Sequence, residues 1–313
     1  MRVAYALATA AITLGTLATS GCDIGKITVN TTSKVLERGQ PSLQMEGDYE
    51  MARQAIPGAL KTVESFWIVD PDNPRLTKIL TEGYCQYGTG FVEDDWEAAK
   101  FKKDLEQTDY HNGRASHIFT RCLNFALKTL GGRWQKEIFA DDQAVVTKLI
   151  ADTGKSKRFP LLFAATALGS LINHNLTRIE MIAYLPTVEA MLNRVVAIDT
   201  KDGAPKNKAH AALPYVALGM IYTARGKSLG GDPDKGRAMF EQALKVSDNK
   251  FLLARTFMAY RVGLANNDRK FFHEQLKIVL ETPPSVWPEQ RLANEVAHRR
   301  ARRYLANEKN LFQ

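Results

Sequence analysis

Cys22 is the residue whose neighbours point most directly to a chemical modification. It follows Ser20 and Gly21 at the end of a run, beginning at Val3, that contains no charged residue. A basic start, an apolar middle and small residues before a cleavage point are typical of a secretory signal peptide. In a bacterial lipoprotein, cleavage falls directly before a cysteine that receives a diacylglycerol. We therefore expect residues 1–21 to be a lipoprotein signal peptide and Cys22 to be lipidated.

Two other interpretations of this segment stay open. Thr19 stands where lipoprotein signals usually have Leu, so an ordinary signal peptide cleaved after Ala18 or Gly21 would leave an incidental cysteine. An uncleaved anchor fits less well, because a span needs about 20 strongly apolar residues. In lipoproteins of enteric bacteria, an acidic residue after the lipidated cysteine resembles the signal for inner-membrane retention, and Asp23 has that position. We expect a periplasmic protein that is lipid-anchored to a membrane, with the inner membrane favoured.

The sequence lacks the common constellations of catalytic or metal-binding residues. It has no Gly-x-Ser-x-Gly nucleophile motif and no P-loop. "FHEQL", residues 272–276, begins like a zinc-binding helix but lacks the second histidine. "GTG", residues 88–90, lies inside a helical pattern, so these glycines are interpreted as allowing close helix packing. We expect no enzymatic activity, no metal and no cofactor.

The charged clusters have simple interpretations. The acidic residues at 93–95 and 141–142 look like solvated charges at helix ends. In "HRRARR", residues 298–303, Arg299, Arg302 and Arg303 share one side of a helix and Arg300 lies away from them. We interpret this run as a solvated helix face, with contact to a lipid surface or an acidic protein as the alternative. Export disfavours nucleic acid as a partner.

Composition indicates an ordinary globular body behind the signal peptide. Apolar residues make up 45% and charged residues 24% of the chain, and the formal net charge is +8. A mature chain of about 290 residues is long enough for one large domain with a core. Residues 22–47 are polar without a sustained period, so we expect a lipid-anchored flexible tether. From residue 48 to 313 amphipathic helices follow one another, and convincing strands are absent.

Small and large residues alternate in a way that indicates repeated helical hairpins. A tetratricopeptide unit has Leu-Gly-x-x-Tyr in its first helix, which Leu218, Gly219 and Tyr222 match. Phe240 and Ala243 match its second helix. Degenerate copies precede and follow this one, although similar helices could mimic a repeat by chance. We expect an all-α fold of tetratricopeptide-like (TPR-like) repeats in a closed or strongly curved solenoid, whose concave face or channel binds something.

Aromatic and small side chains could line such a channel. Tyr84, Tyr87 and Phe91 form a stripe. We interpret it first as core packing, and the more specific alternative is that it lines a passage for a hydrophobic ligand. The apolar helix at 160–172 carries small residues that would leave room beside it. Ala164 and Leu168 of that helix are therefore further candidates for the passage lining.

Cys85 and Cys122 are separated by about the length of one hairpin repeat. They could lie on neighbouring helices, and an envelope location permits a disulfide. Free cysteines are also among the residues most often buried, so the sequence does not decide between the two states.

Several stretches together resemble the T component of tripartite ATP-independent periplasmic (TRAP) transporters, the TatT family. They are "LTKILTEGYCQYGTGFVE", "RFPLLFAATALGSLI", "AYLPTVEAMLNRVVAID", "LPYVALGMIYTARGKSLGGDPDKGRAMFEQALKVSDNKFLLARTFMA" and "PEQRLANEVAHRRARRYLANEKNLF". The resemblance extends from about residue 48 to the end of the chain, and it rests on the order and spacing of these stretches. It implies an all-helical lipoprotein with cryptic TPR-like repeats.

The resemblance also implies a function. Members form homotrimers in which each protomer encloses a channel, and they pair with the transporter's periplasmic substrate-binding protein. The implied ligand is small and apolar or amphipathic. We therefore expect an accessory component of a TRAP transport system. Two alternatives stay open: a TPR-like scaffold lipoprotein that organises an envelope complex without a small-molecule ligand, and an all-helical hydrolase or lyase acting on polysaccharide.

Overall fold

The computed structural model describes residues 24–225 and 230–312, which form helices joined by turns, with no strand among them. The expected all-α class is therefore confirmed for this part of the chain, whereas Cys22, Asp23 and the signal peptide lie outside it. The helices of the first half are α2 (Ile24–Gly39), α3 (Pro41–Gln44), α4 (Tyr49–Val69), α5 (Pro74–Tyr87), the π-helix η1 (Gly88–Val92), α6 (Glu93–Lys102), α7 (Leu105–Leu130), α8 (Gly132–Glu137) and α9 (Gln143–Ala151). Those of the second half are the 3₁₀ turn η2 (Lys155–Lys157), α10 (Arg158–Asn173), α11 (Ile179–Ile182), α12 (Leu185–Asp202), α13 (Lys208–Tyr222), α14 (Pro233–Val246), α15 (Leu252–Ala265), α16 (Arg269–Glu281), the 3₁₀ turns η4 (Pro284–Val286) and η5 (Pro288–Gln290), α17 (Arg291–Ala306) and α18 (Glu308–Leu311).

Asp and Asn side chains start many of these helices. The Asp48 carboxylate accepts hydrogen bonds from the backbone N–H groups of Glu50 and Met51, which satisfies donors that a helix leaves free at its first turn. Asp232 caps α14 and is followed by Pro233, as the sequence predicts. The residues that cap in this way are Asp48, Asn73, Asp104, Asp142, Asn207, Asp232 and Asp268.

Glycines allow the closest approach in two helical hairpins. A Cβ atom added to Gly219 of α13 would lie 2.8 Å from the Phe240 ring of α14. A Cβ atom added to Gly263 of α15 would lie 2.9 Å from the side chain of Phe272 in α16. The other residues expected to pack in the α13–α14 hairpin are all buried: Leu218, Tyr222 and Ala243.

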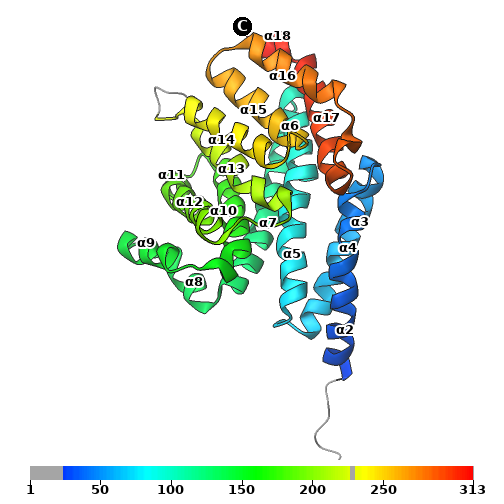
Figure 1. The fold of residues 1–313 in the computed structure, drawn as a ribbon, viewed down its shortest axis with the longest axis vertical. Coiled ribbons are helices and arrows are strands. Elements are labelled where there is room, and N and C mark those ends of the chain that lie inside the picture. Colours follow the sequence, from blue (N-terminus) through cyan, green and yellow to red (C-terminus); the bar gives the residue numbers. More distant parts are fainter. Residues whose placement is uncertain (1–23, 226–229, 313) are drawn as a thin grey trace, which may run out of the picture.

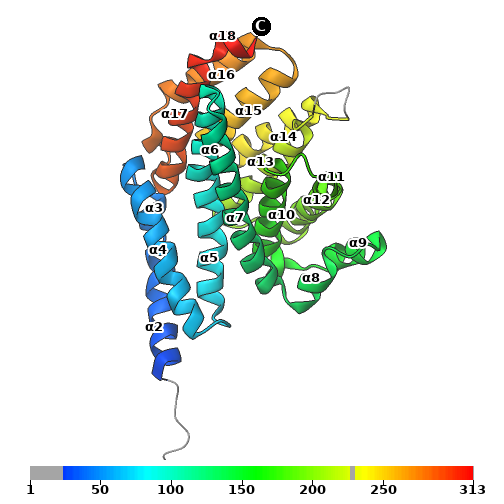
Figure 2. The same cartoon turned by 180° about the vertical axis from the view of Figure 1, so that it is seen from behind.

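Successive helices form an array in which neighbours pack side by side, which Figure 1 shows from one side and Figure 2 from behind. α5 packs against α7, α7 against α10 and α10 against α12, and the array continues through α13, α14, α15 and α16 to α17. α17 then contacts α3 and α4, so the last long helix lies beside helices from the start of the chain.

The segment expected to be a flexible tether is mostly helical from residue 24 onward. It forms α2 and α3, and α2 packs against α4 and α5. Val29 and Ser33 are buried and Leu36 packs on the main core, which places one face of α2 against the body. The Thr and Val residues of this segment lower its intrinsic helix propensity, so its helix depends on tertiary contacts that the local sequence does not show.

A disulfide joins Cys85 of α5 to Cys122 of α7, with the two Cα atoms 5.4 Å apart. The sequence left this pairing undecided because residue spacing alone does not show how two helices lie. The disulfide links two helices that pack side by side, and disulfides of this kind persist in oxidising compartments such as the periplasm.

One stretch of the described residues, Ile179–Asp202, is long and apolar enough to cross a membrane by length and composition alone. It comprises α11 and α12, and α12 packs against α10 and α13. Its residues Val188, Met191 and Leu192 are fully buried, so one face of α12 packs in the core.

Candidate functional site

A cavity of about 570 Å³ lies between helices from both ends of the chain. Its wall is built by α2, α3 and α4 together with α5, α10, α13, α15 and α17. α17 contributes Leu292, Ala293 and Val296, so the C-terminal part of the chain completes the wall. The volume is within the range of small-molecule sites, about 300–1,000 Å³.

Most of this wall is apolar. No Lys, Arg, Asp or Glu lines the cavity anywhere in residues 24–225 and 230–312. Such a wall favours a ligand with a large apolar part, because burial of apolar surface stabilises a complex by about 25 cal/mol per Å². The larger apolar side chains of the wall are Val35, Leu36, Leu43, Ile56, Leu60, Val63, Ile79, Phe91, Phe119, Phe163, Leu213, Phe251, Leu253, Leu292 and Val296.

The π-helix η1 forms part of the wall. It carries Thr89, Gly90 and Phe91 into the cavity lining, and Tyr87 precedes it. A Cβ atom added to Gly88 would lie 2.7 Å from the ring of Phe119, so this position requires glycine and the expected close packing is confirmed there. π-Helical turns are rare and frequently lie at functional sites.

The structure brings together only some of the residues expected to line a passage. Tyr87 and Phe91 lie on the cavity wall. Ala164 and Leu168 are fully buried in the core and are not among the wall residues. Tyr84 also lies off the wall: its hydroxyl donates a hydrogen bond to Glu64 at 2.7 Å, and burial together with this carboxylate raises the pKa of Tyr84.

One region of the wall is polar, and sequence reasoning missed it. The buried carboxylate of Glu82 accepts hydrogen bonds from His210 Nε2 at 2.8 Å, Gln86 Nε2 at 2.9 Å and Gln44 Nε2 at 3.3 Å. Gln290 Nε2 donates to the side-chain oxygen of Gln44 at 3.3 Å. The four donors line the cavity, whereas Glu82 lies behind them. They come from α3, α5, α13 and η5, so no local motif could have revealed them.

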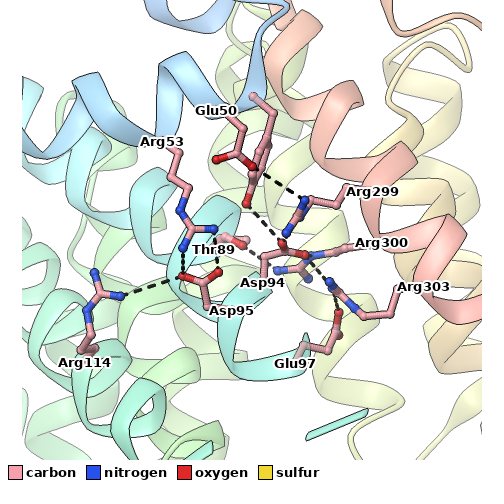
Figure 3. Close-up of polar contacts among 11 residues, drawn as sticks. Glu50, Arg53, Thr89, Asp94, Asp95, Glu97, Arg114, Arg299, Arg300 and Arg303 are labelled. Carbon is pink, nitrogen blue, oxygen red and sulfur yellow. Dashed lines mark hydrogen bonds and ion pairs between the residues drawn. The ribbon is translucent and has the colours of Figure 1, made fainter. Parts of the chain in front are cut away.

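A buried ion-pair cluster holds α17 beside the cavity (Figure 3). Asp94 Oδ2 accepts a hydrogen bond from Arg299 Nε at 2.6 Å, and Asp94 Oδ1 accepts one from Arg303 Nη2 at 2.6 Å. Arg300 Nε lies 3.7 Å from the same carboxylate, and Arg300 Nη2 donates to the carbonyl of Thr89 in η1 at 2.7 Å. The cluster therefore joins α17 to both α6 and the π-helix.

The interpretation of the basic run as a solvated face is wrong for Arg300 and Arg303, whose side chains are 3% and 12% exposed. Arg299 also pairs with Asp94 but stays 40% exposed. Successive helix residues are rotated by about 100°, so positions 299, 303 and 300 fall within one arc of that width. Their side chains converge on Asp94, which is fully buried and was itself expected to be solvated. Arg302 lies outside the arc and is exposed.

The cluster remains ionised at neutral pH. Burial raises the pKa of Asp94, but the charges of Arg300 and Arg303 and the hydrogen bonds from Arg303 and Arg299 outweigh it and hold the pKa below its usual value. Arg303 also donates a hydrogen bond to Glu97. Tyr49 donates to Asp94 at 3.2 Å, and burial and the Asp94 charge raise the pKa of Tyr49.

Two of the histidines are each paired with a single carboxylate, whereas Nε2 of the buried His298 lies 2.9 Å from the carbonyl oxygen of Thr282. His174 lies 3.2 Å from Glu93, and His210 lies 2.8 Å from Glu82. No group of three or more His, Cys, Asp or Glu side chains that could hold a metal ion is found in residues 24–225 and 230–312. The cavity wall in these residues offers no carboxylate that could serve as a general acid or base.

Two comparisons relate the chain to known proteins. The family model described as "TRAP transporter T-component" matches residues 45–312. An uncharacterized protein of Treponema pallidum (strain Nichols) is 22% identical to this chain over 281 residues. The matched residues cover 85% of this chain and 81% of that protein. The residues matched by the family model include the whole Asp94 cluster and most of the cavity wall.

Proposed function

Because this chain belongs to the TRAP transporter T-component family, we propose that it is a non-enzymatic accessory protein of a TRAP transport system that binds a small apolar or amphipathic molecule. Family membership suggests an accessory role in TRAP transport, an envelope location and association with other transporter parts. The observation that supports ligand binding is the apolar cavity of about 570 Å³.

The proposed partner is the periplasmic substrate-binding protein of the transporter, which would receive or deliver the molecule. The proposed architecture is a curved solenoid of TPR-like hairpins, in which α10–α12, α13–α14 and α15–α16 are the repeats. In support of it, these pairs follow one another and two of them have a glycine facing the partner helix. The proposed assembly is a homotrimer.

The proposed attachment to the membrane is a lipid on Cys22, with Asp23 favouring retention in the inner membrane. Because α2 begins at Ile24, such a lipid would hold the N-terminal end of α2 close to the bilayer surface. Ile24 and Ile27 at that end are exposed, and apolar side chains there suit a location near lipid.

Native mass spectrometry of the full chain, extracted from bacterial membranes in a detergent of known mass, tests this proposal. We expect three protomers with a small apolar adduct that is not the detergent and is lost on denaturation. A monomer without an adduct would contradict the ligand and trimer proposals and would favour the scaffold alternative.

A cavity-filling variant tests whether the adduct lies in the cavity. Ala293→Phe adds a ring to the wall contributed by α17, so the adduct should be lost while the fold is retained. Ala306→Phe is the matched control, because Ala306 lies on the same helix, is exposed and is not part of the wall. An adduct retained equally by both variants would place it elsewhere on the protein.

A further inference from the structure

Four polar residues of the cavity wall are joined by hydrogen bonds to Glu82 or to one another, and we name them the glutamine cluster: Gln44, Gln86, His210 and Gln290. The other polar side chains of the wall are those of Gln40, Ser42, Thr89, Thr166 and Ser170. We propose that the glutamine cluster binds the head group of a single-chain amphiphile whose head is uncharged and both donates and accepts hydrogen bonds, such as a hydroxyl or a carboxamide. This inference rests on the proposed function, since it requires that the cavity binds a ligand.

The glutamine cluster has hydrogen-bonding capacity left for a ligand. Each glutamine side chain has two N–H donors and one acceptor oxygen. The bonds to Glu82 and Gln44 use one N–H of each glutamine. A further N–H on each, and the side-chain oxygens of Gln86 and Gln290, are therefore available within the described part of the chain. Gln86 is also exposed, so there is space beside its amide group.

The charges around the cluster favour a neutral head. His210 is a basic residue of the wall, and it is already paired with Glu82 at 2.8 Å. A carboxylate head would therefore lose water without gaining a free cation, and it would be repelled by the Glu82 carboxylate behind the wall. A cationic head would find no carboxylate on the wall that residues 24–225 and 230–312 form, because Glu82 is covered by its three donors.

The rest of the wall suits a single apolar chain. Apart from the glutamine cluster, the wall is lined mainly by aliphatic and aromatic side chains from at least six helices. A ligand with one polar end and one apolar chain would satisfy both regions at once. A ligand with no polar end would leave the spare amide groups without partners, which costs affinity.

The test uses three ten-carbon amphiphiles: 1-decanol, decanoate and decylamine. The full chain is kept soluble in amphipol at pH 7.5, with amphipol alone as the blank. Each compound displaces the apolar dye N-phenyl-1-naphthylamine, and the displacement is followed by fluorescence. We expect 1-decanol to bind at least about tenfold more tightly than either charged compound, because an unpaired buried charge costs at least that factor.

Glu82→Gln tests the part assigned to the buried carboxylate. Removing its charge should raise the affinity for decanoate by about threefold or more and leave that for 1-decanol nearly unchanged. Glu180→Gln is the matched control, because Glu180 is exposed, forms an ion pair with Arg178 and is not a wall residue. If circular dichroism shows that Glu82→Gln does not fold, Gln86→Leu replaces it and should weaken 1-decanol about three- to tenfold.

The outcomes separate this inference from the function on which it rests. Decanoate or decylamine binding as tightly as 1-decanol would overturn the neutral-head inference while leaving ligand binding in place. If wild-type and Glu82→Gln proteins preferred 1-decanol over decanoate by the same factor, this would also overturn the neutral-head inference. Failure of the dye to bind wild-type protein would contradict the proposed function itself.

Discussion

The substitution Asp94→Asn tests whether the buried ion-pair cluster holds the C-terminal helix in place. Asn has the shape of Asp but no charge, so the change leaves Arg299, Arg300 and Arg303 without their shared counter-ion. Arg300 is 3% exposed and Arg303 is 12% exposed, so water cannot replace the lost carboxylate. Removing one partner of a buried ion pair costs about 3–5 kcal/mol. Because Asn still accepts one hydrogen bond and Glu97 still pairs with Arg303, we expect a loss of about 3 kcal/mol.

The assay is urea unfolding of both proteins followed by far-UV circular dichroism, with the free energy of unfolding compared at neutral pH. Asp248→Asn is the matched control, because it makes the same chemical change at an exposed ion pair with Lys208 and should leave the free energy nearly unchanged. A loss below about 1 kcal/mol for Asp94→Asn would show that the Asp94 carboxylate stabilises the fold no more than a surface charge does, and that the cluster does not hold α17 in place.

The difference between wild-type and Asp94→Asn proteins should depend on pH. The folded protein holds the pKa of Asp94 below its value in the unfolded chain, which is about 3.9. The ionised carboxylate therefore stabilises the folded state fully above that value, and the stabilisation is lost as the pH falls through the lower folded-state pKa. The difference in free energy of unfolding between the two proteins should be constant from neutral pH to about pH 5 and should become smaller in stronger acid.

Three further predictions concern packing, the disulfide and the anchor. Gly219→Leu should destabilise the protein by about 1–3 kcal/mol, because its side chain would overlap the Phe240 ring, and an unchanged urea midpoint would count against this hairpin packing. Replacing Cys85 and Cys122 together by Ser should lower the free energy of unfolding by about 2–4 kcal/mol, and equal stability of the double variant and the oxidised wild type would contradict a structural disulfide. Cys22→Ser should move the protein from the membrane fraction to the soluble fraction after cell lysis, and continued membrane attachment would argue against lipidation.

Local patterns in the sequence predict much of the fold. The spacing of apolar residues places the helices, and Asp232 followed by Pro233 marks the start of α14. Leu218, Gly219 and Phe240 indicate the hairpin that α13 and α14 form. These features depend on interactions between residues close in the chain, which a sequence displays directly.

Features that depend on distant contacts could not be predicted in this way. Arg299 and its partner Asp94 are 205 positions apart, and Gln290 and its partner Gln44 are 246 apart. The sequence does not show whether an arginine is buried or solvated, so the basic run favoured the wrong interpretation. α2 was missed for a related reason, since its helix depends on packing against α4 and α5.

Only part of the predicted passage lining faces the cavity, because local periodicity found the stripe but distant contacts decided which of its residues lie on the wall. Tyr87 directly precedes the π-helix and Phe91 lies within it, and both side chains line the cavity. Tyr84 lies one helical turn earlier on the same stripe, yet it packs inward and binds Glu64. Periodicity identifies such a stripe, but the neighbouring helices decide which of its residues face the cavity.

The most direct measurement of the central claim is an electron-density map of the full chain, crystallised as purified from bacterial membranes. We expect elongated density for an apolar chain among Phe91, Leu213 and Val296, with its polar end within hydrogen-bond distance of Gln86. A cavity that holds only ordered water, or one closed by the protein's own side chains, would contradict ligand binding at this site.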